Sequence, residues 1–198
     1  MSLSRNELHK QPKIGVMASA RLPDSNQSRE RLIELAQRMG HAIAAHNCVL
    51  VTGATTGFPD VISRASRERG GLTIGISPAH STDEHTSEYA LPDDGVDVLI
   101  YTGFGLKGRN VINVRSSDIV LIFGGELGTL NEFTIAYDEG KVIGVLEGTG
   151  GVAERIMEIS RLSTRREPGE IIFEKEPETL LDRCLDVFSR AATARLSL

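Results

Sequence analysis

Short apolar runs with strand character alternate with longer amphipathic segments along most of the chain. The strand-like runs are residues 13–19, 48–53, 72–77, 96–101, 119–123 and 142–146, with a short seventh at 171–173. Apolar residues at helical spacing predict helices at 25–47, 59–69, 107–116, 129–139, 151–161 and 176–190. Parallel strands need a crossover between them, which is usually a helix. The alternation therefore predicts an α/β, doubly wound fold, with a mostly parallel sheet of about six or seven strands and helices on both faces.

The length of 198 residues suits one domain spanning residues 1–198, with flexible ends at 1–12 and 191–198. Two segments interrupt the alternation. Residues 78–95 are rich in Ser, Thr, Asp, Glu and Pro and are predicted to form a long loop, which is either a binding element or a mobile acidic excursion. Residues 163–170 form the second interruption and lead to the short seventh strand.

Charge and cysteine content narrow the classes of partner. The formal net charge of −5 argues against broad capture of nucleic acid or of an anionic membrane, and favours a small-molecule ligand. Two scattered cysteines, Cys48 and Cys184, indicate neither a disulfide framework nor a zinc site, so we expect a reducing cytoplasm. No apolar run approaches the roughly 18 residues that span a bilayer. The five histidines show no metal-binding spacing, and we expect no metal and no cofactor.

Candidate binding residues follow the strands, because ligands of doubly wound sheets bind beyond the carboxyl ends of the strands. The first strand is followed by Ser19 and Arg21, and the second by Gly53, Thr55 and Gly57. The fifth strand is followed by a glycine-rich turn that contains Gly124, Gly125, Glu126, Gly128 and Thr129. Glycines at the start of a helix let unpaired N–H groups approach an anion closely. We therefore expect these turns to bind phosphate.

The fifth turn also has a purely structural interpretation. Thr129 and Glu132 have the Thr-x-x-Glu spacing of a capping box, which would need no ligand. Capping does not account for three glycines among five residues, and the two interpretations are compatible. A basic residue is expected to complete the anion site, and Arg109, after the Gly-Phe-Gly-Leu-Lys-Gly turn at 103–108, is favoured over Arg115.

Taken together, residues 109–118 and the segment Gly-Gly-Glu-Leu-Gly-Thr-Leu-Asn-Glu at 124–132 resemble the Arg-Lys and Pro-Gly-Gly-x-Gly-Thr-x-x-Glu signature of the Lonely Guy (LOG) family, part of the wider SLOG superfamily. The resemblance extends more loosely over residues 13–146. It implies a Rossmann-like fold, a homodimer, and hydrolysis of the N-glycosidic bond of a nucleoside 5′-monophosphate. The glycine loop would then hold phosphate, and Arg109 and Glu132 would act at the ribose.

The sequence departs from the family pattern at three places. Asn110 stands where the family has lysine, Phe123 where it has proline, and Gly53-Ala54-Thr55 where it has three glycines. The superfamily also contains nucleotide sensors, a molybdenum-cofactor carrier and a DNA-processing protein, so the same loop serves binding without turnover. Two functions remain open: a nucleotide-binding phosphoribohydrolase, or a carrier or sensor that binds a nucleotide or cofactor without chemistry.

Overall fold

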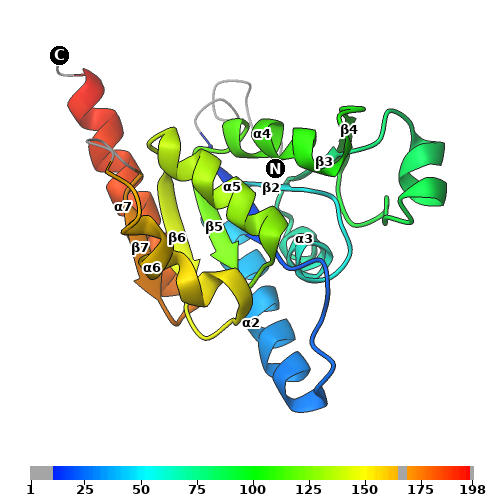
Figure 1. Cartoon of the computed structure of the whole chain (residues 1–198), viewed down its shortest axis with the longest axis horizontal. Coiled ribbons are helices and arrows are strands. Elements are labelled where there is room, and N and C mark those ends of the chain that lie inside the picture. Colours follow the sequence, from blue (N-terminus) through cyan, green and yellow to red (C-terminus); the bar gives the residue numbers. More distant parts are fainter. Residues whose placement is uncertain (1–10, 165–168, 197–198) are drawn as a thin grey trace.

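The computed structural model describes residues 11–164 and 169–196, and its core is one seven-stranded sheet (Figure 1). The strands are β1 (Lys13–Ala18), β2 (Val49–Thr52), β3 (Thr73–Ser77), β4 (Val98–Tyr101), β5 (Ile119–Phe123), β6 (Val142–Leu146) and β7 (Ile171–Glu174). They lie in the order β4-β3-β2-β1-β5-β6-β7, and every pair is parallel. The predicted doubly wound fold is therefore confirmed.

The strand order reverses between β1 and β5. From β1 the chain builds outward through β2, β3 and β4, then returns to place β5 on the other side of β1 and continues through β6 to β7. The crossovers on the two sides of this point diverge and leave a crevice at the carboxyl ends of the two strands. In the register, Ala18 lies opposite Phe123, so the turns that begin at Ser19 and Gly124 start at the same level of the sheet.

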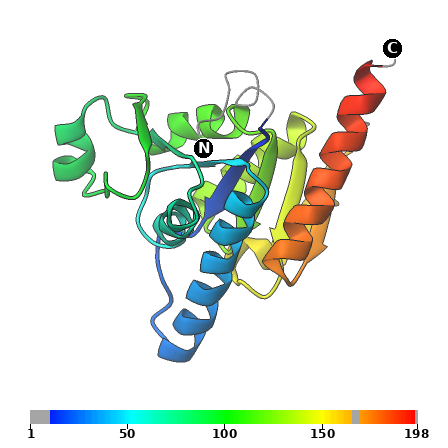
Figure 2. The same ribbon diagram turned by 180° about the vertical axis from the view of Figure 1, so that it is seen from behind.

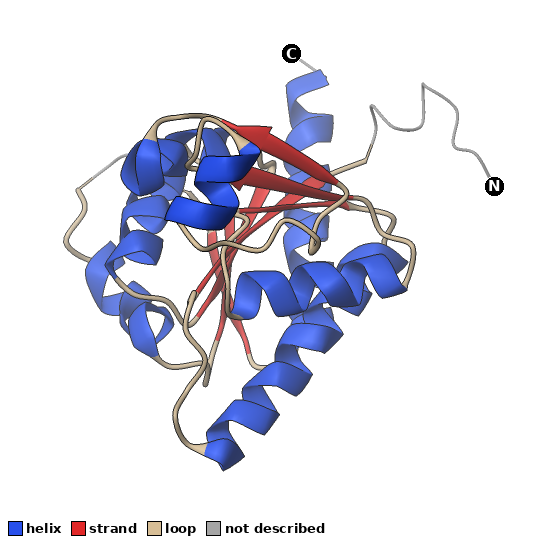
Figure 3. Cartoon of the chain, turned by 90° about the vertical axis from the view of Figure 1, so that its right-hand side faces the viewer, coloured by secondary structure: helices blue, strands red, loops and turns tan. Residues whose placement is uncertain are grey.

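Helices cover both faces of the sheet, as Figures 1 and 2 show from opposite sides and Figure 3 from its edge. The α-helices are α2 (Asn26–Ala45), α3 (Phe58–Glu68), α4 (Gly105–Arg115), α5 (Leu127–Asp138), α6 (Ile156–Ser160) and α7 (Pro177–Leu196). Helices α2, α3 and α7 pack on one face and α4, α5 and α6 on the other. Alternate residues of β5 serve the two cores: Leu121 faces the α2 side and Ile122 the α5 side.

The central strands are almost entirely apolar because both faces of the sheet are covered. Every residue of β2, β5 and β6 is buried, whereas β4 at the edge of the sheet exposes Val98 and Ile100. Burial on two faces removes the alternation that a half-exposed strand shows. This is why continuous apolar runs located the central strands from sequence to within about two residues.

The segment at 78–95 contains one helical turn, η1 (Glu84–Glu88), and is anchored through a buried histidine. His85 Nε2 lies 3.0 Å from the carbonyl oxygen of Pro92, so this nitrogen carries the proton. His85 Nδ1 is then the acceptor for the hydroxyl of Ser77, 2.8 Å away at the end of β3. These two contacts attach the segment to the end of β3, a feature that neither sequence interpretation described.

The other departures from expectation lie at element ends. The predicted helix at 151–161 divides into a 3₁₀ turn, η2 (Gly151–Arg155), followed by α6. Helix α7 continues to Leu196, whereas a flexible end was expected from residue 191. Residues 1–10, 165–168 and 197–198 lie outside the described residues, together with the expectations that fall on them.

Among the described residues, no helix has the length and apolar character needed to cross a membrane.

Candidate functional site

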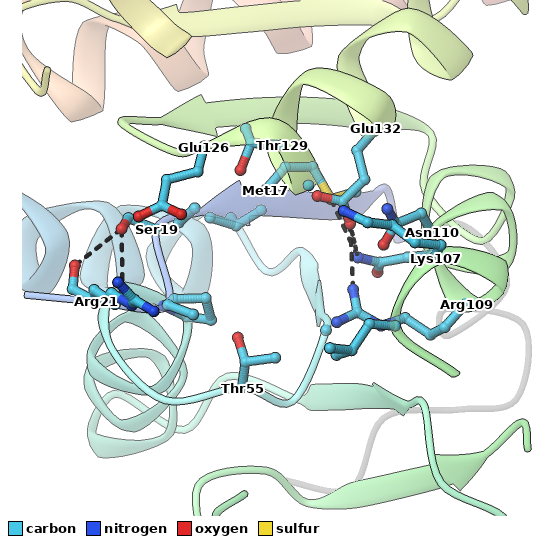
Figure 4. Close-up of a pocket in the computed structure, with 18 residues that line it drawn as sticks. Met17, Ser19, Arg21, Thr55, Lys107, Arg109, Asn110, Glu126, Thr129 and Glu132 are labelled. Carbon is cyan, nitrogen blue, oxygen red and sulfur yellow. Dashed lines mark hydrogen bonds and ion pairs between the residues drawn. The ribbon is translucent and has the colours of Figure 1, made fainter. Parts of the chain in front are cut away.

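A cavity of about 260 Å³ opens at the crevice between β1 and β5 (Figure 4). Its walls come from the turn after β1, the turn after β2, helix α4 and the first turns of α5. Figure 4 shows two ends: the Arg21 end has Ser19, Arg21 and Glu126, and the Arg109 end has Lys107, Arg109, Asn110 and Glu132. Three cationic and two acidic side chains line the cavity, so it is more positive than the chain as a whole.

A buried ion pair forms the Arg109 end. Arg109 Nη1 lies 3.3 Å from Glu132 Oε1, and each residue is only 6% exposed. Asn113 Nδ2 donates a second hydrogen bond, of 3.0 Å, to the same carboxylate oxygen. Arg109 and Asn113 are four residues apart on α4 and so share one face of that helix. The carboxylate of α5 is thereby held by two donors from α4.

Burial shifts the titration of both charged groups. Desolvation raises the pKa of Glu132 above its ordinary value, while Arg109, Asn113 and Lys107 oppose that shift. Desolvation likewise lowers the pKa of Arg109, against the opposing charge of Glu132. A carboxyl group whose pKa is raised above its ordinary value holds a proton more readily and can take part in proton transfer.

The Arg109 guanidinium packs directly against Gly53. A Cβ atom at this position would lie 2.3 Å from Arg109 Nη1 and 2.6 Å from both Cζ and Nη2. Real Cβ atoms essentially never come so close, so the guanidinium lies directly on the backbone at the end of β2. The glycine is therefore needed for space at this position.

The start of α5 supplies an anion-binding element. The helix begins at Leu127, and Gly128 and Thr129 of its first turn line the cavity. The first N–H groups of a helix have no partner within it and carry the positive end of its dipole. The Lys107 ammonium group lies beside this turn, since a Cβ on Gly128 would be 3.8 Å from Nζ. A phosphate group fits this combination.

The turn after β1 closes the Arg21 end. The Ser19 hydroxyl donates to the Arg21 carbonyl oxygen at 2.9 Å and accepts from the Arg21 N–H at 3.2 Å, which fixes the turn. The Arg21 side chain lies at the cavity and forms no ion pair within the described part of the chain. Thr55, from the turn after β2, lies between the two ends in Figure 4.

Nine of the twelve residues expected at the site line this cavity: Ser19, Arg21, Gly53, Thr55, Arg109, Glu126, Gly128, Thr129 and Glu132. The other three, Gly57, Gly124 and Gly125, do not line the cavity. Each is required by the local structure instead. Gly57 caps α3 with φ of 76°. The Gly124 N–H donates to Thr149 Oγ1 at 2.9 Å, and a Cβ on Gly125 would lie 2.4 Å from Thr129 Oγ1.

The capping-box interpretation of the fifth turn is wrong. Helix α5 begins two residues earlier than expected, its N-cap is Glu126, and Thr129 therefore lies inside the helix. No side chain caps this terminus. Glu132 bonds to Arg109 and Asn113 across the cavity instead, because the burial of the Arg109 charge requires a countercharge there.

The competing basic candidate, Arg115, lies elsewhere. Its Nε donates to Glu139 Oε1 at 2.8 Å on the exposed side of α4, outside the cavity. Three polar residues of the cavity lining, Lys107, Asn110 and Asn113, were not predicted as site residues. Asn113 could have been predicted because it lies four residues after Arg109, on the same face of the helix. Asn110 could have been predicted because it directly follows Arg109.

No group of three or more His, Cys, Asp or Glu side chains in residues 11–164 and 169–196 is arranged to hold a metal ion.

Fold and cavity together define a Rossmann-like protein with a charged ligand cavity at the reversal of its strand order. The model of the SLOG cluster4 family matches residues 11–181, and the chain belongs to this family. A protein of Archaeoglobus fulgidus is 34% identical over 118 residues, which are 60% of this chain and 72% of that protein.

Solved structures agree with this assignment. The protein TM1055 superposes with a TM-score of 0.75 at 25% identity, over 89% of this chain and 99% of that one. The molybdenum cofactor binding protein of Rippkaea orientalis gives 0.72 at 29% identity, over 90% and 98%. The molybdenum cofactor carrier protein of Chlamydomonas reinhardtii gives 0.68 at 26% identity, over 91% and 99%. DNA processing protein A of Helicobacter pylori, at 20% identity and a TM-score of 0.58, shares the fold.

Proposed function

We propose that this protein binds a nucleoside 5′-monophosphate or a closely related phosphorylated cofactor in the cavity between β1 and β5. The proposal rests on one observation: the same cavity contains an anion-binding helix start and a buried ion pair. The start of α5, with Lys107 beside it, suits a phosphate group. The buried Arg109–Glu132 pair lies deeper and suits the polar groups of a sugar. Two solved relatives whose names describe binding or carriage of molybdenum cofactor also support a cofactor-like ligand.

We further propose hydrolysis of the N-glycosidic bond as the reaction. The C–N bond between ribose and base breaks, water supplies the oxygen of the new C–O bond, and a proton passes to the base. Positive charge builds on the ribose ring as the base leaves, and the Glu132 carboxylate would stabilise it. With its raised pKa, Glu132 can also take the proton of the attacking water. Arg109 would orient the carboxylate.

A carrier without chemistry is the second candidate. The names of the Rippkaea orientalis and Chlamydomonas reinhardtii proteins favour it, as does Asn110, which stands at the position of the lysine in the LOG signature. Asn110 Nδ2 donates to Asn131 Oδ1 at 2.8 Å, so this amide is held by the neighbouring helix. The two candidates share a cavity and differ only in turnover.

A panel of nucleoside monophosphates separates the candidates. Free base is followed by chromatography and binding by calorimetry, for the wild type and for Arg109→Ala and Glu132→Ala. The controls are Arg115→Ala and Glu139→Ala, which break an ion pair outside the cavity between α4 and the residue that follows α5. Hydrolysis predicts base release by the wild type and both controls, and at least 100-fold less by the two cavity variants. Saturable binding without release supports the carrier, and no binding at all refutes both.

Charge and cysteine content suggest where the protein acts and which partners it lacks. We propose a cytoplasmic protein, in keeping with two free, buried cysteines, that has no nucleic-acid partner, in keeping with the net charge of −5. We also propose that the protein is a homodimer, as the resemblance to the LOG family implies. Sedimentation equilibrium can test this. Retention of single-stranded DNA at physiological salt would contradict the expectation on nucleic acid.

A further inference from the structure

Two oppositely charged side chains line the Arg21 end of the cavity and do not pair with each other. Arg21 comes from the turn after β1 and Glu126 from the start of α5, and Figure 4 shows both at the same end. Both residues are exposed, so a ligand can reach their charged groups. Within residues 11–164 and 169–196, neither the guanidinium nor the carboxylate has a hydrogen bond or an ion pair. Both groups are therefore available to a ligand.

The main chain holds both residues in place. The turn that carries Arg21 is tied to the turn after β2, because the Thr56 hydroxyl donates to the Ala20 carbonyl oxygen at 3.0 Å. On the other wall, Glu126 follows Gly125, whose carbonyl oxygen accepts an N–H of η2 at 2.9 Å. The two charges thus extend from fixed backbone on two walls of the cavity. A site that is held in this way loses little freedom when a ligand binds.

The proposed phosphate and sugar sites leave the Arg21 end of the cavity to the base. A nucleotide joins phosphate, sugar and base in that order. Lys107, beside the proposed phosphate site, and the Arg109–Glu132 pair, at the proposed sugar site, both lie at the Arg109 end. One turn further along α4, the lining residue Asn113 is only 1% exposed, so the cavity does not open in that direction. A base attached to the sugar therefore extends toward the Arg21 end.

A carboxylate beside a guanidinium selects a particular edge of a base. A carboxylate only accepts hydrogen bonds, and a guanidinium only donates them. Guanine has two adjacent donors, its ring N1–H and its 2-amino group, which match the two oxygens of a carboxylate. Next to them it has two adjacent acceptors, O6 and N7, which are the usual bidentate partners of arginine. Guanine therefore satisfies both side chains at once.

The other bases satisfy this pair of charges less well. Adenine and cytosine each have a ring nitrogen acceptor beside the amine, so the second carboxylate oxygen would face a lone pair instead of a donor. Uracil has a single donor between two carbonyl groups. An acceptor placed against a carboxylate is repelled and also costs a hydrogen bond, and both effects favour guanine.

We propose that the Arg21 end of the cavity is the base subsite and that Arg21 and Glu126 make it selective for guanine. Glu126 accepts from the ring N–H and the amine, and Arg21 donates to O6 and N7. This inference rests on the proposed nucleotide binding and names the base. The LOG signature assigns neither residue a role, because Glu126 occupies the variable position of Pro-Gly-Gly-x-Gly-Thr and Arg21 lies outside the signature.

The first arm of the test compares ligands on the unmodified protein. Dissociation constants are measured by calorimetry for the 5′-monophosphates of guanosine, inosine, adenosine, cytidine and uridine. Inosine monophosphate lacks only the 2-amino group of guanosine monophosphate. Hydrogen bonds to charged groups are among the stronger ones, so we expect guanosine monophosphate to bind at least about tenfold more tightly than adenosine monophosphate and about fivefold more tightly than inosine monophosphate.

The second arm assigns the selectivity to the two side chains. Glu126→Gln replaces one acceptor by a donor, so the preference for guanosine over inosine monophosphate should fall to about onefold. Both ligands carry the same phosphate, so this ratio is independent of any general change in phosphate binding. Arg21→Gln should lower the affinity for guanosine monophosphate relative to ribose 5-phosphate, which has no base, by at least about fivefold.

The matched controls are Glu139→Gln and Arg115→Gln. They make the same changes outside the cavity and should leave every ratio intact. Thermal unfolding checks that each variant is folded, and the substituted residues of the cavity are exposed, so their loss removes no core packing.

Each outcome bears on the proposal. Equal binding of all five nucleotides by the wild type, or a preference for another base, overturns guanine selection while the proposed nucleotide binding stands. If Arg21→Gln weakens guanosine monophosphate and ribose 5-phosphate by the same factor, Arg21 binds phosphate and its assignment to the base is wrong. An unchanged guanosine preference in Glu126→Gln removes the carboxylate from the subsite. If no nucleoside monophosphate binds the wild type, this inference and the proposed function both fall.

Discussion

Replacing Gly53 by alanine tests whether the position of the Arg109 guanidinium determines ligand binding and activity. The new methyl group would begin 2.3 to 2.6 Å from three atoms of the guanidinium. Ordinary carbon contacts start near 3.4 Å, so Arg109 must move by about 1 Å. No left-handed backbone is involved at this position, so the change introduces no strain in the main chain. The guanidinium would then move away from a contact with Glu132 that is already 3.3 Å long.

The expected loss is large because the pair is buried. A displacement of about 1 Å in a catalytic group can cost roughly 100-fold in rate. Separating a buried ion pair also destabilises a fold, by about 3 to 5 kcal/mol when one partner is removed outright. For Gly53→Ala we expect a smaller loss of stability, because the arginine remains, together with about 100-fold weaker base release or at least tenfold weaker ligand binding.

A double-mutant cycle isolates this mechanism. Urea unfolding and ligand binding are measured for the wild type, Gly53→Ala, Arg109→Ala and the double variant. If the methyl group acts by displacing the guanidinium, adding Gly53→Ala to Arg109→Ala changes little. Full additivity of the two effects, or a Gly53→Ala protein that binds like the wild type, would refute the reasoning.

Three further perturbations have defined outcomes. Glu126→Gln removes a negative charge from the cavity wall at the start of α5, so phosphate should bind roughly threefold to tenfold more tightly at low salt, and calorimetry showing no gain would contradict this. Burial raises the pKa of Glu132 above 4.5, so the folded state retains a proton that the unfolded chain releases. The unfolding free energy of the wild type should therefore fall relative to Glu132→Gln as the pH rises above 4.5, and a rise would reverse the assigned sign. Burial raises the pKa of Cys48 to about 11 and that of Cys184 to about 12, so a thiol reagent at pH 8 should label them only after denaturation, and rapid labelling of the native protein would contradict their burial.

The strands and the ligand edge of the sheet were predictable because their signals are local. A continuous apolar run such as 119–123 needs two covered faces, and the turn after it must lie at the carboxyl edge of a parallel sheet. The same logic brought Ser19 and Gly53 to the cavity from distant parts of the chain.

The features that the sequence did not predict depend on contacts between residues that are distant in the chain. Thr129 and Glu132 fit a capping box locally, yet the buried charge of Arg109 determines the contact that Glu132 makes. Asn113 belongs to no motif, and only the folded structure shows that its amide donates to Glu132. The anchoring of residues 78–95 through His85 depends on Ser77, in a strand that precedes the segment.

The anchored segment at 78–95 lies apart from the cavity. His85 ties it to Ser77 and Pro92, and none of its residues lines the cavity. The segment is therefore tied to the end of β3 and forms no part of the cavity wall. Changes to its sequence away from His85 are expected to leave the wall that a ligand would contact unaltered.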